Sequence, residues 1–190
     1  MTLFAQLSHT NAEKQCILQG VVLIPWRILR AETMKVLPHT HSCFVCGESN
    51  PIGFNLRFET DGTIVTARVV PRREHAGFRE VVHGGLVATL LDEVMVWACA
   101  VATRRFAYCA ELNVRFLQPL RPGEPSILSA HLATNRKNRI FEAEGSLKTE
   151  AGVTLATSTG KYLPISEADA SKLAEDFAPS GSVINQIWDT

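Results

Sequence analysis

From Gly53 onward, apolar and polar residues of the chain alternate mostly with a period of two. The stretches 54–59 and 63–70 alternate in this way and flank Asp61-Gly62, a pair typical of hairpin turns. Four later stretches alternate similarly and are separated by Pro-Gly, polar or Glu-Ala-Gly turns. They are residues 108–119, 126–134, 138–149 and 153–163. The pattern therefore predicts six strands.

One segment, residues 84–103, follows the 3.6-residue period of a helix instead. Its apolar half consists of Leu86, Val87, Leu90, Leu91, Val94, Met95, Trp97 and Val101. The other half carries mostly small residues together with Asp92 and Glu93. Two strands, one long helix and four strands in this order predict an α+β fold, in which an antiparallel sheet is covered by a single helix.

The two ends of the chain lack this regular pattern. Residues 1–42 are expected to form an N-terminal extension, and Met34 is an alternative biological start because the domain pattern begins shortly after it. The central domain is expected over residues 43–164. In the C-terminal tail, residues 165–190, a Ser-x-x-Asp sequence precedes an alanine-rich stretch and predicts a short capped helix.

Composition and charge narrow the classes of protein. Lys and Arg together number 19, as do Asp and Glu, so the basic excess that phosphate neutralisation requires is missing and nucleic acid is not expected as a partner. The most apolar N-terminal run, residues 16–29, contains Pro25 and Arg27 and is shorter than the roughly 20 apolar residues of a membrane span. The five cysteines are an odd set that suits reduced thiols. We expect a cytoplasmic protein without a membrane partner.

Two glycines stand at the entrance of the predicted helix, directly after His83. The first turn of a helix has unpaired N–H groups and the positive end of the helix dipole, and glycine lets a ligand oxygen approach closely. Gly84 and Gly85 could therefore polarise a carbonyl as an oxyanion hole. The alternative is that they only relieve a tight turn into the helix.

The carboxylates in the middle of the helix are open to two interpretations. Asp92 and Glu93 could belong to a solvated face, as most charged residues do. They could also face a partner or a substrate cleft, because their neighbours on that arc are small or apolar. Gly84 and Asp92 are separated by about 12 Å along one helix, at roughly 1.5 Å per residue. If both act on one substrate, the carboxylate must come from a second, antiparallel copy, and function requires a dimer.

Three motifs, in this order along the chain, carry a resemblance to a known family. They are "CFVCGESNPIGFNLRF" at 43–58, "HGGLVATLLDE" at 83–93 and "AELNVRFLQPLRPGE" at 110–124. Together they resemble the PaaI-like acyl-CoA thioesterases of the hotdog fold. The resemblance implies a five- to six-stranded antiparallel sheet wrapped around one long central helix. It also implies hydrolysis of acyl-CoA thioesters by a homodimer or dimer of dimers with its active site at the interface, and no cofactor or metal.

Carried over by residue, the resemblance assigns the carboxylate of Asp92 as nucleophile or general base, acting across the subunit interface. Gly84, with Gly85 beside it, corresponds to the backbone donor to the thioester carbonyl. His83 corresponds to the residue near the sulfur, although a histidine here could also merely hydrogen-bond the preceding loop. Glu93 is the second candidate for the carboxylate. A thiolate is a good leaving group, so a carboxylate and an oxyanion hole can suffice.

Two positions depart from the family pattern. Cys109 stands where many relatives have Ser or Thr to hold the attacking water, and a cysteine is a weak hydrogen-bond partner. Gly77, with His75 nearby, stands where some relatives have a helpful Asn. These departures leave a non-catalytic acyl-CoA binding module as the alternative function. A hotdog dehydratase lacks support because its His-and-acid pattern is not evident.

The sequence Cys43-x-x-Cys46-Gly invites a zinc interpretation, with His39 and His41 as further ligands. A second Cys pair is missing, and the resembling thioesterases often carry this motif without metal. We therefore expect no metal here.

A basic cluster between two predicted strands is the leading candidate for binding the phosphates of coenzyme A. It contains Arg136, Lys137 and Arg139, with Arg104 and Arg105 as second candidates. The alternative is an ordinary solvated turn. The acyl group would meet aromatic side chains, for which Trp97, Phe78 and Phe116 are the candidates.

Overall fold

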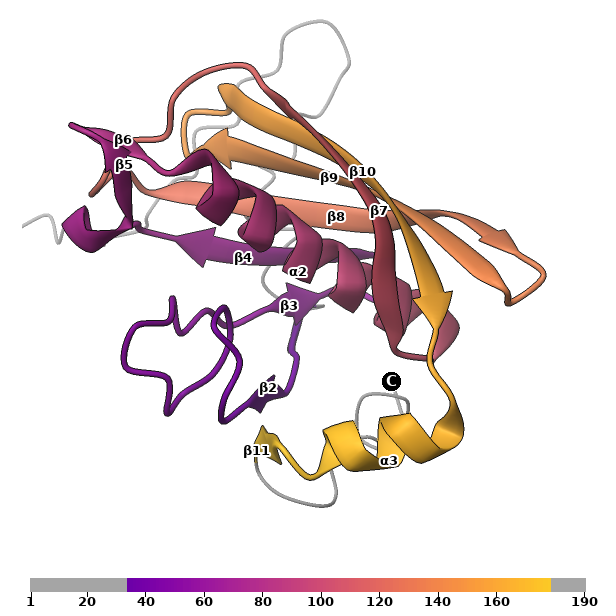
Figure 1. Cartoon of the computed structure of the whole chain (residues 1–190). Helices are drawn as coiled ribbons and strands as arrows, with labels where there is room; N and C mark the ends of the chain where they lie inside the picture. Colours follow the sequence, from indigo (N-terminus) through magenta and orange to yellow (C-terminus); the bar gives the residue numbers. More distant parts are fainter. Residues whose placement is uncertain (1–33, 179–190) are drawn as a thin grey trace, which may run out of the picture. The chain divides into compact units, whose positions relative to one another are not determined.

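A single long helix, α2 (Gly84–Thr103), runs along one face of an antiparallel sheet (Figure 1). The computed structural model describes residues 34–178. The chain divides into two compact units, Met1–Glu32 and Thr33–Thr190, of which the first lies outside the described residues. The expectations for Cys16 and for residues 1–33 and 179–190 therefore stay predictions.

The main sheet has seven strands in the order β1-β3-β4-β8-β9-β10-β7, and all neighbours pair antiparallel. Their bounds are β1 Lys35–Val36, β3 Glu59–Thr60, β4 Ile64–Val69, β7 Ala107–Phe116, β8 Ser126–Arg136, β9 Ile140–Thr149 and β10 Thr154–Pro164. The predicted hotdog architecture is confirmed: a long helix lies against an antiparallel sheet that curves around it. The sheet exceeds the expected five to six strands because two-residue β1 and β3 extend it.

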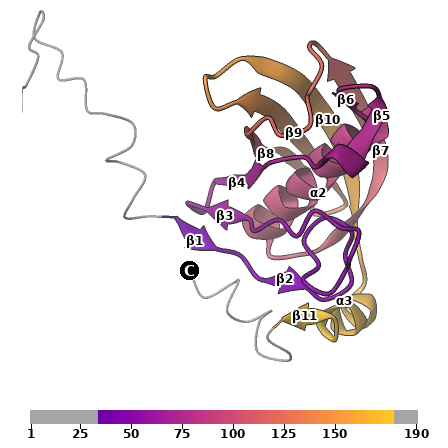
Figure 2. The same cartoon turned by 90° about the vertical axis from the view of Figure 1, so that its left-hand side faces the viewer.

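Short elements complete the described chain. β2 (His39–Thr40) pairs with β11 (Phe177–Ala178), and β5 (Ala76–Phe78) pairs with β6 (Val81–Val82) after the 3-10 turn η1 (Arg73–His75). The predicted C-terminal helix is present as α3 (Glu167–Ala174), capped by the Ser166 side chain, which accepts a hydrogen bond from the Asp169 N–H. Figure 2 shows β2 and β11 side by side, away from the main sheet.

The predicted strand at 54–59 is wrong for most of its length. Only Glu59–Thr60 pairs in the sheet, because Asn55 adopts a left-handed backbone conformation with a φ of 53° that interrupts the extended chain. The preceding residues bond to the cysteine loop instead. The N–H groups of Phe54 and Leu56 donate to the carbonyls of Phe44 and Val45, each at 2.9 Å.

α2 is buried on more than the face that its apolar pattern indicates. Leu90, Leu91, Val94 and Met95 are inaccessible, but Cys99 on the supposed polar arc is inaccessible too. The helix packs against β4, β7, β8, β9 and β10, and the segment between β2 and β3 covers another side through Glu93. By length and composition α2 could cross a bilayer, as core helices often could.

Candidate active site

Asp92 lies half-buried in the middle of α2, and its carboxylate contacts Tyr162 of β10, the strand next to edge strand β7. The Tyr162 hydroxyl donates to Asp92 Oδ1 at 2.9 Å. Tyr162 is fully buried and stands opposite Cys109 in the register of β10 and β7, next to a bulge between Lys161 and Tyr162. Such bulges re-aim a side chain relative to a regular strand. The sheet therefore holds one oxygen of Asp92 by a defined contact.

Three weakly acidic groups surround this carboxylate and keep their protons at neutral pH. Burial, together with the Asp92 charge, raises the pKa of Tyr162 well above its usual value. Partial burial and a hydrogen bond with Asp92 raise the pKa of Cys109 to about 11, and burial raises the pKa of Cys99 to about 12. Cys109 is consequently a thiol donor beside Asp92, in place of the hydroxyl that the family pattern has.

His83 caps the N-terminus of α2. Its Nδ1 accepts the N–H of Gly85 at 2.9 Å, so a neutral imidazole carries its proton on Nε2. Gly77 lies against this histidine, because a Cβ at Gly77 would stand 3.0 Å from both Cα and Cδ2 of His83. A side chain at this position would require His83 to shift by a few tenths of an ångström.

The two glycines of the helix mouth have different hydrogen bonding. The Gly85 amide is engaged with His83. The Gly84 amide has no hydrogen-bond partner within residues 34–178. Gly84 is the first residue of α2, where the helix dipole presents its positive end. Gly84 thus offers the unpaired donor that a developing oxyanion requires.

An apolar cavity of 370 Å³ opens beside Gly84. Its lining includes Phe78, Phe116 and Leu117, and Phe78 is 83% exposed. Trp97 was also a candidate for an acyl cleft, but it is buried in the core against Phe58, Phe106 and Phe177. Of the three candidate aromatic residues, the structure brings two to the helix mouth and excludes Trp97.

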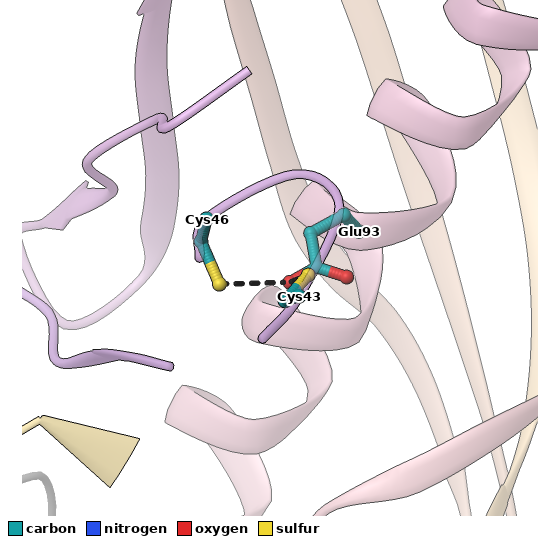
Figure 3. A group of neighbouring side chains, drawn as sticks. All are labelled: Cys43, Cys46 and Glu93. Carbon is teal, nitrogen blue, oxygen red and sulfur yellow. Dashed lines mark hydrogen bonds between the residues drawn. The ribbon is translucent and has the colours of Figure 1, made fainter. Parts of the chain in front are cut away.

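Glu93 points away from this site, toward the loop between β2 and β3 (Figure 3). The sulfur atoms of Cys43 and Cys46 lie 3.6 and 3.5 Å from Glu93 Oε1. Burial of the carboxyl group raises the pKa of Glu93 to about 8. His39 and His41 do not join this group, because their ring nitrogens contact Glu48 at 3.0 and 2.6 Å.

The two cysteines of the loop have opposite acidities. The hydrogen bond from Cys46 and backbone N–H groups, including that of Val45 at 3.2 Å, lower the pKa of Cys43. The same hydrogen bond, together with burial, raises the pKa of Cys46. All four cysteines of the described chain are free. Because its pKa is lowered, Cys43 is the cysteine of this pair with the greater thiolate character.

The predicted phosphate-binding cluster lies in the turn between β8 and β9, which Figure 1 shows at the opposite end of the sheet from β5 and β6. Arg136 pairs with Glu142 at 2.8 Å, while Lys137 and Arg139 make no ion pair within the described residues. The register of the sheet places this turn at the same end of the strands as Cys109. In one chain it is therefore on the side of Asp92 and far from Gly84.

Sequence reasoning missed two features. Tyr162 was not predicted as a site residue, because a regular strand pattern does not reveal the bulge next to it, which turns its hydroxyl toward Asp92. A second basic group, Arg73, Arg79 and Arg121, lines a hollow of 630 Å³. Arg73 and Arg79 lie six residues apart, but Arg121 is distant in the sequence, so no local pattern reveals the whole group. These arginines lie near the helix mouth, since β5 and β6 immediately precede α2.

Residues 80–156 match the sequence model of the thioesterase superfamily. Acyl-coenzyme A thioesterase 13 of Homo sapiens and that of Pongo abelii are each 28% identical over 85 residues, which cover 44% of this chain. The chain spans 60% of the length of these curated relatives.

Solved structures agree in the fold. A thioesterase superfamily protein is 25% identical, with a TM-score of 0.59 over 65% of this chain and 60% of that chain. The PaaI protein of E. coli, from the phenylacetic acid degradation operon, is 17% identical, with a TM-score of 0.54 over 60% of this chain and 81% of that chain. The matched segment includes the helix mouth, Asp92 and Cys109. With its helix-wrapped antiparallel sheet, this chain has the hotdog fold, and its residues 80–156 are similar to the thioesterase superfamily.

Proposed function

We propose that this protein hydrolyses acyl-CoA thioesters to the free acid and coenzyme A. One observation carries the proposal: α2 presents a backbone amide at Gly84 that has no partner among the described residues, and a carboxylate at Asp92 that Tyr162 holds in place. A donor for a developing oxyanion and a carboxylate base or nucleophile are the two groups that this reaction needs. The similarity to acyl-coenzyme A thioesterase 13 supports the choice of substrate.

In the proposed reaction the thioester carbonyl oxygen accepts a hydrogen bond from the Gly84 amide. Asp92 acts as general base on a water molecule, or attacks the carbonyl carbon itself and is then released by water. A carbon–oxygen bond forms, the carbon–sulfur bond breaks, and the proton taken from water passes to the departing thiolate. Because Gly85 is engaged by His83, we assign the contact to the carbonyl to Gly84. His83 is left to act near the sulfur through its outer ring nitrogen.

The proposed site combines two subunits. Gly84 lies at the Phe116 end of β7, and Asp92 lies beside Cys109 near the other end. β7 is an edge strand in the described sheet, so one side of its backbone is available for pairing. If two copies pair antiparallel about Leu112 and Asn113 of β7, Cys109 of one faces Phe116 of the other. Asp92 of the partner subunit then approaches Gly84.

The apolar cavity beside Gly84 suits the acyl group. Its walls are mostly apolar side chains, and burial of an apolar chain there is favourable by roughly 25 cal/mol per Å². Phe78 and Phe116 are the candidate residues for acyl-chain selection.

The Asp92→Asn variant tests the function directly. We measure the hydrolysis of a panel of acyl-CoAs by the release of free thiol. We expect its rate to fall by about 10²- to 10⁴-fold, the usual contribution of a positioned base. Acyl-CoA binding and the oligomeric state should persist. If Asp92→Asn retains wild-type rates, Asp92 is not the catalytic carboxylate.

A non-catalytic acyl-CoA binding module is the second candidate. The weak donor at Cys109 and the absence of an amide side chain at Gly77 favour it. Wild-type protein that binds acyl-CoA by calorimetry but releases no thiol from any member of the panel would establish this alternative.

Charge reversal distinguishes two candidate sites for the nucleotide phosphates. We expect Lys137→Glu to raise KM more than it lowers kcat, because the predicted cluster then repels a phosphate. Arg79→Glu, near the helix mouth, is the matched change in the second basic group. An effect on KM only in the Arg79 variant would move the phosphate site to that hollow and remove the turn from it.

A further inference from the structure

Three metal-ligating side chains converge between the loop that follows β2 and the middle of α2. The Sγ atoms of Cys43 and Cys46 and a carboxylate oxygen of Glu93 all lie within 4.8 Å of one another (Figure 3). We propose that these residues bind a divalent, thiophilic cation of the zinc class, which ties the cysteine loop to α2. This metal site is separate from the proposed thioesterase site, because Asp92, the residue before Glu93 in the helix, faces Tyr162 instead.

The distances fit tetrahedral coordination. Zinc–sulfur bonds of about 2.3 Å and zinc–oxygen bonds of about 2.0 Å place sulfur and oxygen ligands roughly 3.5 Å apart in a tetrahedron. The two sulfur-to-oxygen distances here are 3.6 and 3.5 Å. A cation could therefore contact all three atoms with little movement of the side chains, and a solvent oxygen would complete the tetrahedron.

The charges favour a cation at this place. Glu93 makes no ion pair within residues 34–178, and its polar neighbours are the thiols of Cys43 and Cys46 and the Trp97 side chain. Arg57 is close to the loop but donates to the backbone carbonyls of Cys46 and Leu56. A metal ion bound here supplies the positive charge that stabilises a buried carboxylate in its ionised form.

The loop holds its sulfur atoms in position before any ligand binds. The Val45 N–H donates to Cys43 Sγ at 3.2 Å, and Thr40 Oγ1 lies 3.6 Å from Cys46 Sγ. Gly47 closes the turn by donating its N–H to the Cys43 carbonyl at 2.9 Å. A Cβ at Gly47 would stand 2.7 Å from the Cys43 nitrogen, so the turn requires glycine. Such outer contacts orient ligands and favour thiolate.

This proposal revises the expectation drawn from the sequence. In the sequence a second Cys pair is missing, and His39 and His41 are the candidates for further ligands. The structure pairs both histidines with Glu48 and supplies Glu93 from 47 residues beyond Cys46. The set of ligands thus becomes two thiolates and one carboxylate.

The test is metal content of the untagged full-length protein, purified under reducing conditions and measured by mass spectrometry. We expect about one equivalent of zinc per chain, released on reaction of the thiols, since metal binding requires deprotonated cysteines. Cobalt added to the metal-free protein should give the sulfur-to-metal absorption of thiolate coordination and the visible bands of a tetrahedral site.

Glu93→Gln is the decisive variant, because it keeps the size of the side chain. Its zinc affinity should fall by about 100-fold or more, as loss of even an outer-sphere partner costs 10- to 100-fold. Asp92→Asn is the matched control on the same helix and should keep its zinc while losing hydrolysis. His41→Ala should also keep its zinc. The two proposals can therefore fail independently.

Several results would overturn the metal site. One is folded wild-type protein whose two loop cysteines are reduced and that takes up neither zinc nor cobalt. Another is Glu93→Gln with unchanged zinc affinity. If Glu93→Gln does not fold, Cys43→Ser replaces it as the test variant. A zinc affinity of Cys43→Ser equal to that of the wild type would again exclude the metal site.

Discussion

Asp92 and Glu93 are neighbours in the sequence but lie in different chemical environments. Successive residues of a helix point about 100° apart, so their side chains reach different elements. Asp92 contacts Tyr162 and Cys109 at the sheet edge, whereas Glu93 contacts the cysteine loop. The carboxylate at the sheet edge is therefore available to a substrate, and the other is covered by a neighbouring segment.

The reactivity of Cys109 reports on Asp92. With a pKa of about 11, only about one thiol in 10³ is thiolate at pH 8, and alkylation should be slow although the residue is exposed. The rate should rise with pH until the thiol titrates. In Asp92→Asn the carboxylate no longer raises this pKa, so alkylation at pH 8 should be several-fold faster.

Peptide mass spectrometry after timed alkylation measures this rate separately for each cysteine. Cys43, whose pKa is lowered, serves as the internal control and should react independently of the residue at position 92. Equal Cys109 rates in the two proteins would show that the carboxylate does not act on this thiol.

At the scale of elements, the start of α2 matters most for the proposed chemistry. His83 occupies the N-cap with a ψ of 127°, and Gly84 is the first helical residue. Proline is favoured at this first position because its amide would be unpaired anyway. It also suits the backbone of the preceding residue. The amide of Gly84 can thus be deleted without breaking the helix.

Gly84→Pro should lower kcat by about 10²- to 10³-fold, the cost of removing one oxyanion donor. Gly84→Ala is the matched variant that keeps the amide. Its Cβ would meet Phe116 atoms at 3.5 and 3.6 Å, which is ordinary contact, so its loss should be much smaller. Circular dichroism and steady-state kinetics of both variants make the comparison. Equal losses would mean that space at the helix mouth, not the amide, is what the substrate needs.

At the scale of the whole molecule, the proposed function depends on a second copy. Within one chain, Gly84 and Asp92 of α2 are about 12 Å apart along the helix and lie near opposite ends of the neighbouring strand β7. The edge of β7 carries exposed Tyr108 and Phe116, which pairing with another chain would cover. Two complete sites then form per dimer, each from two chains.

Subunit complementation checks this arrangement. When inactive Asp92→Asn and Gly84→Pro chains are refolded together in equal amounts, half of the dimers are mixed, and each mixed dimer has one intact site. Activity should return to about one quarter of the wild-type value. Asp92→Asn mixed with Asp92→Ala is the control and should stay inactive. If the mixture of Asp92→Asn and Gly84→Pro chains is no more active than either variant alone, each active site lies within one chain.

Local patterns were enough for much of the fold and part of the site. The long helix was predicted with the bounds that the structure has, because its apolar period and its glycine entrance are local signals. β8, β9 and β10 were predicted to within two residues. The prediction of a strand at 54–59 was wrong because Asn55 interrupts the extended chain and the backbone of Phe54 and Leu56 bonds to the cysteine loop, which a period of two does not reveal.

The sequence by itself determined the element order, the family resemblance and the identity of Asp92 and Gly84 as candidates, because these depend on residues close together along the chain. Only the tertiary structure decided what each side chain faces. It brought Tyr162 to Asp92, engaged Gly85 with His83, and gathered Cys43, Cys46 and Glu93. Such meetings depend on how distant segments pack, and packing is a property of the whole fold rather than of any local pattern.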